Sequence, residues 1–195
     1  MDIDINDFFI EIPQIQFDPA DFFDLIEESE FKEYRGYEGD GFPLITCSDD
    51  EMRSSDVVQH YANVFKDFDL RQSNYVSTQV SPGVERAHEY DPTETKLFGT
   101  LIKGDMSEKI ITPHIDATRT AAIVFPLSFP QHVNLLEEKG STSPYYVHEY
   151  NPVVTIIHAG KHWHSVSVTP YIKYQFQFDC YNSWDEIVDL VNQFS

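Results

Sequence analysis

The amino-acid sequence predicts a mainly β (α+β) domain, with an antiparallel sandwich or barrel at its centre and helices beside it. The chain has 195 residues and is 41% hydrophobic and 14% aromatic, which suits one domain with a packed core. Beyond residue 70, short β-type runs alternate with turns, a spacing typical of antiparallel β folds. The expected strands span residues 75–80, 96–102, 120–127, 153–157, 163–168 and 172–178.

The N-terminal segment is expected to support this β core. Residues 3–17 place apolar side chains among acids and predict an extended outer strand. Asp18 followed by Pro19 is an N-cap with proline at the first helical position, and predicts a helix that ends near residue 29. The apolar face of this helix comprises Phe22, Phe23, Leu25 and Ile26.

A loop and a second helix follow. Residues 31–50 are rich in Gly, Tyr and acidic residues and predict a loop with a short strand at 44–46. The second helix is expected to run from Ser55 or Asp56 to about residue 65. Its buried positions are expected to be Val57, Val58, Tyr61 and Val64.

Residues 128–150 are predicted to be an irregular segment, because they are too many for a hairpin turn and are rich in Pro, Ser, Tyr and Glu. Loops of this length are usually lids or binding loops. The tyrosines of this segment either cover a site or serve packing and surface roles: Tyr145, Tyr146 and Tyr150.

Ser183 opens an amphipathic C-terminal helix. The chain has no internal repeat and no linker, so we expect a single domain over residues 1–195. Within it, residues 1–70 are the helical and extended support, 71–180 the β core and 183–194 the terminal helix.

The charge balance excludes several classes of function. Lys and Arg number 13 against 33 Asp and Glu, which gives a net charge of −20 at pH 7. Such a surface repels nucleic-acid phosphates and anionic lipid headgroups, so we expect no nucleic-acid or membrane partner. The sequence has neither a run of about 18 apolar residues nor a positive N-terminal segment, and we expect a cytoplasmic protein. Cys47 and Cys180 are expected to be reduced, with a single disulfide as the alternative.

His114 and Asp116 are the strongest candidates for metal ligands. Residues i and i+2 of a strand point to the same face, so these two side chains can hold one ion. A third ligand can come from the histidine-rich run at 158–166. Two imidazoles and one carboxylate form the facial triad that suits non-haem Fe(II) and leaves positions open for other ligands. The alternative is that these histidines are exposed or hydrogen-bonded side chains without a ligand role.

The strand expected at 172–178 alternates between two kinds of side chain. Its apolar face comprises Ile172, Tyr174, Phe176 and Phe178, and its polar face comprises Lys173, Gln175 and Gln177. Lys173 is a lone cation on an otherwise uncharged polar face, and is placed to pair with an anionic ligand inside a barrel mouth. The alternative is an exposed edge lysine.

Together these residues resemble the signature of the iron(II)- and 2-oxoglutarate-dependent oxygenases: HxD, a distal histidine and, further on, a basic residue. The likeness covers residues 97–178, where PHIDATRTAAIVFPL is similar to the first metal strand of the family and NPVVTIIHAGKHWHSV to its distal strand. Among members, the short oxygenases common in phage and bacterial genomes are the most similar. The resemblance implies a double-stranded β-helix, a cupin-like jelly roll, with flanking helices.

The resemblance also implies roles for individual residues. His114, Asp116 and His164 would bind Fe(II) and form the catalytic centre, and Lys173 would receive the C5 carboxylate of 2-oxoglutarate. Most members have Arg at the cosubstrate position, and Lys is associated with collagen-type prolyl hydroxylases. Lysine supplies the positive charge without the bidentate fork of arginine.

Two residue assignments stay open. The distal ligand can instead be His162 or His158, although the His-Ser-Val context and the spacing to Lys173 favour His164. Arg119 either contacts the cosubstrate or an acidic group of the substrate, or forms a structural salt bridge, which is the role we favour.

The implied activity is hydroxylation of a C–H bond, coupled to conversion of 2-oxoglutarate and O2 into succinate and CO2. Asp116 favours hydroxylation, because the halogenases of the family replace this carboxylate. The acidic surface favours a peptide, an amino acid or another small metabolite as the substrate. The alternatives are a non-catalytic cupin-like metal- or ligand-binding module and an acidic phage interaction protein. A phage-encoded protein would act in the cytoplasm of the bacterial host, and the oligomeric state stays open.

Overall fold

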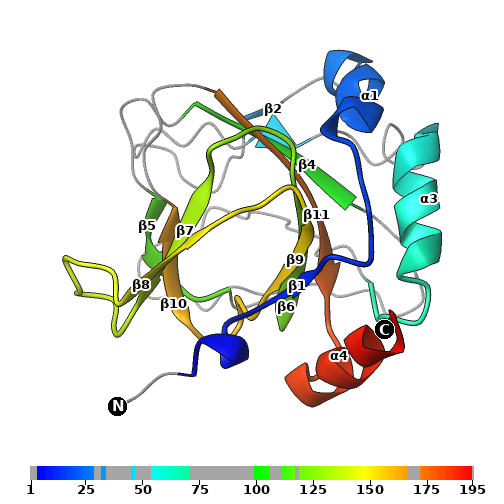
Figure 1. Cartoon of the computed structure of the whole chain (residues 1–195). Coiled ribbons are helices and arrows are strands. Elements are labelled where there is room, and N and C mark those ends of the chain that lie inside the picture. The colour runs from blue at the N-terminus through cyan, green and yellow to red at the C-terminus, as the bar shows by residue number, and fades with distance from the viewer. Residues whose placement is uncertain are drawn as a thin grey trace, which may run out of the picture.

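Two antiparallel β-sheets form the centre of the protein in a computed structural model of the chain (Figure 1). The sequence prediction of a mainly β protein with flanking helices is therefore confirmed. The structure describes residues 4–28, 32–33, 45–46, 54–70, 99–105, 111–116, 119–166 and 172–194. The strand expected at 75–80, most of the loop expected at 31–50 and Cys47 lie outside the described residues.

Within the described residues, the larger sheet has seven strands in the order β1-β9-β6-β11-β4-β3-β2. Their bounds are β1 Phe9–Ile12, β9 Val154–Ile157, β6 Ala121–Pro126, β11 Ile172–Cys180, β4 Gly99–Asp105, β3 Ile45–Thr46 and β2 Lys32–Glu33. Strand β1 lies at one edge, which agrees with the outer strand expected within residues 3–17. The expected strands at 96–102, 120–127, 153–157 and 172–178 correspond to β4, β6, β9 and β11.

The described part of the smaller sheet has four strands in the order β5-β10-β7-β8. Their bounds are β5 Ile111–His114, β10 Trp163–Val166, β7 His132–Leu136 and β8 Tyr146–Glu149. Strand β10 pairs with β5 on one side and with β7 on the other. This pairing places the histidine-rich end of β10 beside the HxD segment.

The prediction that residues 128–150 are irregular is wrong. The segment contains β7 and β8, which pair as an antiparallel hairpin with His132 opposite Glu149. A five-residue strand that contains asparagine has a weak β pattern of its own. The pairing of β7 with a neighbour on each side stabilises it as a strand. Tyr150, at the end of this segment, is buried between the two sheets.

Helices cover the outer face of the larger sheet. Those whose side chains pack on this face are η2 Pro19–Phe22, α1 Phe23–Glu28, α3 Asp56–Val64, α4 Trp184–Val191 and η4 Asn192–Phe194. The short helix η1 Ile5–Asp7 precedes β1 and has no side chain in this layer of the core. The helix starts agree with the sequence: the side chains of Asp18 and Ser55 accept backbone N–H bonds, and Ser183 forms a capping box with Glu186. Phe23 was expected on the buried face of its helix and is instead 59% exposed. None of the described helices has the length and apolar character that a membrane span needs.

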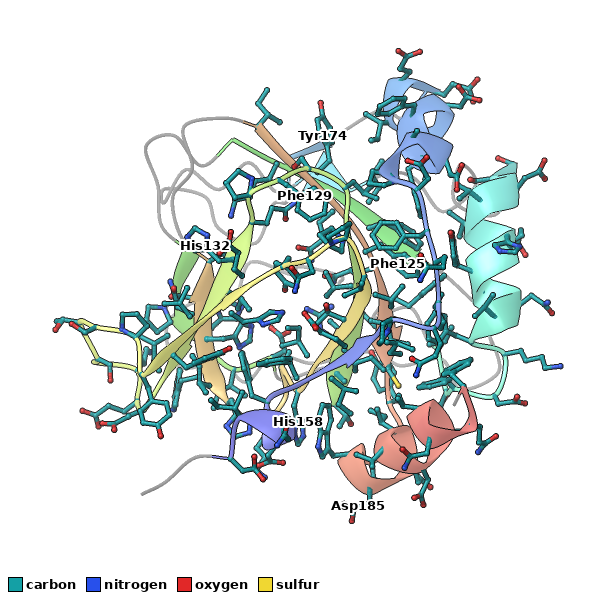
Figure 2. The ribbon with its side chains drawn as sticks, viewed as in Figure 1. Phe125, Phe129, His132, His158, Tyr174 and Asp185 are labelled. Atoms are coloured by element: carbon teal, nitrogen blue, oxygen red, sulfur yellow. The ribbon has the colours of Figure 1, made fainter. Side chains whose placement is uncertain are left out.

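The hydrophobic core has two layers, one on each face of the larger sheet. In the outer layer, Phe125, Phe176 and Phe178 pack against α1, α3 and α4, and Figure 2 shows Phe125 on the α3 side of the sheet. In the inner layer, Val124 of β6 packs against Leu135 of β7, across the space between the sheets. Successive residues of a strand point to opposite faces of the sheet. On β11, the residues that alternate with Phe176 and Phe178 therefore face this inner space.

Candidate metal centre

The pairing of β5 with β10 brings the two sequence motifs together. His164 lies directly opposite His114 in the ladder, and the centroids of their rings are 4.3 Å apart. His164 also lies opposite Leu135 of β7, which packs into the inner layer of the core. Because directly opposite residues of an antiparallel pair share a face, both imidazoles point into the space between the sheets.

Asp116 completes a group of three potential ligands with His114 and His164. The His114 Nε2 atom lies 3.4 Å from Asp116 Oδ1, and the His164 Nε2 atom lies 3.9 Å from Asp116 Oδ2. One ligand atom of each residue lies within 4.8 Å of those of the others. Ligand atoms around one ion with bonds of about 2.1 Å are separated by roughly 3.0 to 3.4 Å, so the three side chains need only small adjustments to hold a metal.

The His164 ring is oriented by a backbone contact. Its Nδ1 atom lies 3.0 Å from the carbonyl oxygen of His162, which can only accept a hydrogen bond. Nδ1 therefore carries the proton, and Nε2 offers its lone pair toward Asp116 and His114. Burial lowers the pKa of His164 to about 4, so the ring is neutral at pH 7 and suited to bind a metal.

Arg119 holds the carboxylate of Asp116 through one of its two oxygens. Its Nε and Nη2 atoms donate to Asp116 Oδ2 at 2.9 and 2.7 Å, and its Nη1 atom donates to Asp179 of β11. Burial alone would raise the pKa of the Asp116 carboxyl, but the charge of Arg119 and the hydrogen bond to His114 outweigh it and hold this pKa well below its usual range. Arg119 thus forms the structural salt bridge that we favoured from the sequence. Its alternative role, contact with a cosubstrate, stays untested.

A tight turn after β9 sets the position of the HxD loop. The Ala159 carbonyl accepts a hydrogen bond from the Asp116 amide at 3.0 Å, and the Gly160 amide donates to the Thr120 carbonyl at 2.9 Å. A Cβ atom at Gly160 would lie 2.3 Å from the carbonyl oxygen of Arg119. Only glycine permits this close approach of the two backbones.

Lys173 faces the same inner space from β11. Gln177 and Asp179 lie directly opposite Val124 and Ala122 of β6, which belong to the inner layer. Lys173 is an even number of residues before them along β11, so its side chain points to the same face of the sheet. The Lys173 side chain is only 6% exposed, so it is not an exposed edge lysine. Burial lowers the pKa of its ammonium group to about 8. A buried ammonium group in this space is a suitable partner for an anionic ligand.

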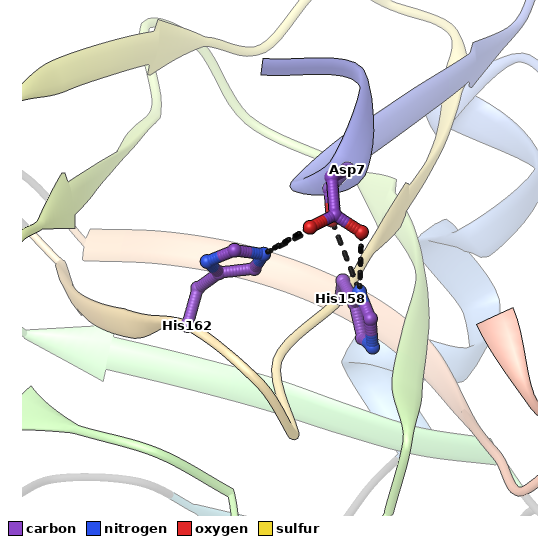
Figure 3. Close-up of side chains that lie close together, drawn as sticks. All are labelled: Asp7, His158 and His162. Carbon is purple, nitrogen blue, oxygen red and sulfur yellow. Dashed lines mark hydrogen bonds and ion pairs between the residues drawn. The ribbon is translucent and has the colours of Figure 1, made fainter. Parts of the chain in front are cut away.

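The two alternative distal ligands lie elsewhere. His158 and His162 approach Asp7, a residue of the N-terminal segment, and not the pair formed by His114 and Asp116 (Figure 3). Sequence reasoning missed Asp7 and also Asp179, the second partner of Arg119. Both residues are distant in sequence from the motifs that they contact, and no local pattern marks them.

No model of a known protein family matches the chain, and no curated protein matches it significantly. The fold and the site therefore define the class of protein: a mainly β protein with two histidines and one carboxylate gathered between its sheets.

Proposed function

We propose that the protein is an Fe(II)- and 2-oxoglutarate-dependent dioxygenase that hydroxylates a C–H bond of a peptide, an amino acid or a small metabolite. The observation that carries this proposal is the convergence of His114, Asp116 and His164 in the inner space that Lys173 also faces. Two neutral imidazoles and a carboxylate on one side of an ion are the donor set of non-haem Fe(II) oxygenases. Fe(II) and 2-oxoglutarate, when bound here, would allow O2 to oxidise a C–H bond of the substrate, and 2-oxoglutarate would be converted to succinate and CO2.

We also infer that the sandwich is a jelly roll, the double-stranded β-helix. The order of the strands supports this inference: β9-β6-β11-β4 form the centre of one sheet and β5-β10-β7-β8 form the other. From β4 to β11 the chain crosses between the sheets at every step except the β7–β8 hairpin. In such a barrel, ligands bind inside the mouth between the two sheets.

Each residue of the site has a distinct part in this proposal. His114, Asp116 and His164 hold the metal, and Arg119 fixes one oxygen of Asp116 so that the other stays directed toward His114. Lys173 binds the far carboxylate of 2-oxoglutarate through its charge. The apolar side chains of the inner layer limit access of water to this space.

The acidic surface restricts the substrate. A protein with a net charge of −20 attracts cations and repels polyanions over the whole surface, except where a bound metal and buried cations reverse the local field. A peptide with basic residues or a small metabolite is therefore favoured over a nucleic acid.

Anaerobic titration with Fe(II) and 2-oxoglutarate tests the proposal. The wild-type protein should develop the weak visible absorption band of 2-oxoglutarate chelated to Fe(II). His114→Ala should abolish the band, and Lys173→Ala should require at least tenfold more 2-oxoglutarate to reach it. His60→Ala is the matched control, since His60 is exposed on α3, and should leave the band unchanged.

Two other outcomes would replace the proposal by a different function. Iron binding that depends on His114 but shows no effect of 2-oxoglutarate would indicate a metal-binding module. Absence of both, in protein that circular dichroism shows to be folded, would indicate an interaction protein whose histidines serve the structure.

A further inference from the structure

A second group of metal-ligating side chains lies between the N-terminal segment and the turn that joins β9 to β10. Asp7 ends η1, and the chain continues into β1, which pairs with β9. The amide of His158 donates to the carbonyl of Phe8 at 2.7 Å, which holds the two segments together. His158 and His162 then turn their rings toward Asp7 from the same turn, as Figure 3 shows.

We propose that Asp7, His158 and His162 form a second divalent-metal site, separate from the first, which clips the N-terminal segment onto the β-sandwich. The site offers two imidazole nitrogens, the carboxylate of Asp7 and the backbone carbonyl oxygen of Asp7. This inference does not depend on the proposed oxygenase function, because the two sites share no ligand residue.

The distances between these atoms match the edges of a coordination shell. The carbonyl oxygen of Asp7 lies 3.0 Å from His158 Nδ1 and 3.1 Å from His162 Nε2. The carboxylate oxygens of Asp7 lie 3.6 Å from His158 Nδ1 and 3.3 Å from His162 Nε2. With metal–ligand bonds of about 2.1 Å, neighbouring ligands are roughly 3.0 Å apart in an octahedron and roughly 3.4 Å apart in a tetrahedron. A carbonyl oxygen only accepts hydrogen bonds, so both nitrogens carry a proton in this arrangement. One ion therefore fits among these atoms once each ring moves that proton to its other nitrogen.

Both rings are held in place by aromatic neighbours. The His158 ring stacks on Trp184 with a centroid distance of 4.2 Å and an angle of 2° between the planes. The His162 ring meets Phe8 edge to face at 5.8 Å. Because these contacts restrict rotation of the rings, the protein loses little side-chain entropy when the nitrogens bind an ion.

Lys161 is the cation that accompanies Asp7 in this structure. Its Nζ atom lies 2.5 Å from Asp7 Oδ2, and its side chain is 54% exposed. A half-exposed ammonium group can leave the carboxylate for solvent at small cost, because exposed ion pairs are weak. Lys161 is thus a competitor that a divalent ion displaces, and removing it should strengthen metal binding.

The donor set selects the kind of ion. Two imidazoles with oxygen donors suit Zn²⁺, and a set of four protein donors without an open position is typical of structural zinc. The position between the N-terminal segment and the sandwich fits a structural role. The His162 carbonyl also orients His164, so an ion here would steady the first site through the backbone.

Zn²⁺ titration by calorimetry tests the second site, with His114→Ala as the background in which the first site is disabled. We expect this background to retain one Zn²⁺ ion and to show a higher midpoint of thermal unfolding when Zn²⁺ is present. Adding His158→Ala, or separately Asp7→Asn, should remove both effects. Adding Lys161→Met should lower the dissociation constant about twofold to fivefold.

Several results would contradict the proposed second metal site. The background variant binding no Zn²⁺ while folded, or binding that survives His158→Ala and Asp7→Asn, would overturn it. Weaker binding in Lys161→Met would also contradict it, since that result would make Lys161 a structural partner and not a competitor. His60→Ala in the same background should change nothing. Failure of these tests leaves the titration with Fe(II) and 2-oxoglutarate unaffected.

Discussion

Replacing Arg119 by methionine should strongly destabilise the protein at neutral pH. Arg119 lies between two carboxylates, Asp116 in the HxD loop and Asp179 on β11. The side chains are 16%, 14% and 10% exposed, so water can do little to solvate the charges if the arginine is removed. Breaking a buried ion pair by deleting one partner costs about 3–5 kcal/mol. We expect the free energy of unfolding of Arg119→Met to fall by about this amount.

The pH dependence of this loss identifies its cause. In the wild-type protein the pKa of Asp116 is depressed, so the folded state gains stability above the usual pKa of the carboxyl and loses it as the pH falls. Without Arg119, burial instead favours the protonated carboxyl. The difference in stability between wild type and variant should therefore be largest near pH 7 and shrink below about pH 4.

Urea unfolding followed by circular dichroism at several pH values measures both effects. Arg119→Lys is the matched control: it keeps the charge but lacks the bidentate fork, and should lose less than the methionine variant. A loss under about 1 kcal/mol at pH 7, or a loss that stays constant down to pH 3.5, would refute the assignment of Arg119 as the charge partner of the two carboxylates.

Three further changes have expected outcomes. Lys173→Met should stabilise the protein by up to about 3 kcal/mol at pH 7, because burial lowers the pKa of this lysine to about 8. Urea unfolding should show this gain in stability shrinking between pH 8 and 10.5, where the unfolded wild-type chain binds more protons than the folded one. A gain that stays constant over this range would contradict the prediction. Gly160→Ala should lower the free energy of unfolding by about 1–3 kcal/mol and weaken Fe(II) binding, since the added Cβ would lie 2.3 Å from the Arg119 carbonyl oxygen. An unchanged affinity for Fe(II), measured by calorimetry, would show that this contact does not set the position of the HxD loop. Ser183→Ala should cost about 1 kcal/mol through loss of the α4 capping box, measured by thermal unfolding. Ser143→Ala, at an exposed position outside any helix, is the matched control and should change little.

Features that depend on short-range geometry were predictable from the sequence. The alternation of residues 172–178 placed Lys173 on the inner face and Phe176 on the outer face, as the structure confirms. Asp18, Ser55 and Ser183 marked helix starts, because a cap forms within three residues of its partner. The HxD pattern was expected to place His114 and Asp116 on one face of a strand, but β5 ends at His114, and Asp116 is positioned by the hydrogen bond from its amide to the Ala159 carbonyl.

Other features depend on contacts between distant segments, and the sequence pattern did not contain them. The β7–β8 hairpin was missed, because pairing with neighbours stabilises β7 more than its own residues do. The choice among three nearby histidines was decided by the register of β10 against β5, which sets His164 opposite His114.

The sequence by itself determined the β class of the protein, the helix starts and the inward direction of Lys173, because these follow from backbone geometry over a few residues. Only the tertiary structure decided which histidine joins His114 and Asp116, that Arg119 bridges to Asp179, and that Asp7 meets His158. Those contacts arise from strand register and from the packing of the N-terminal segment, which depend on the whole chain and not on any short pattern within it.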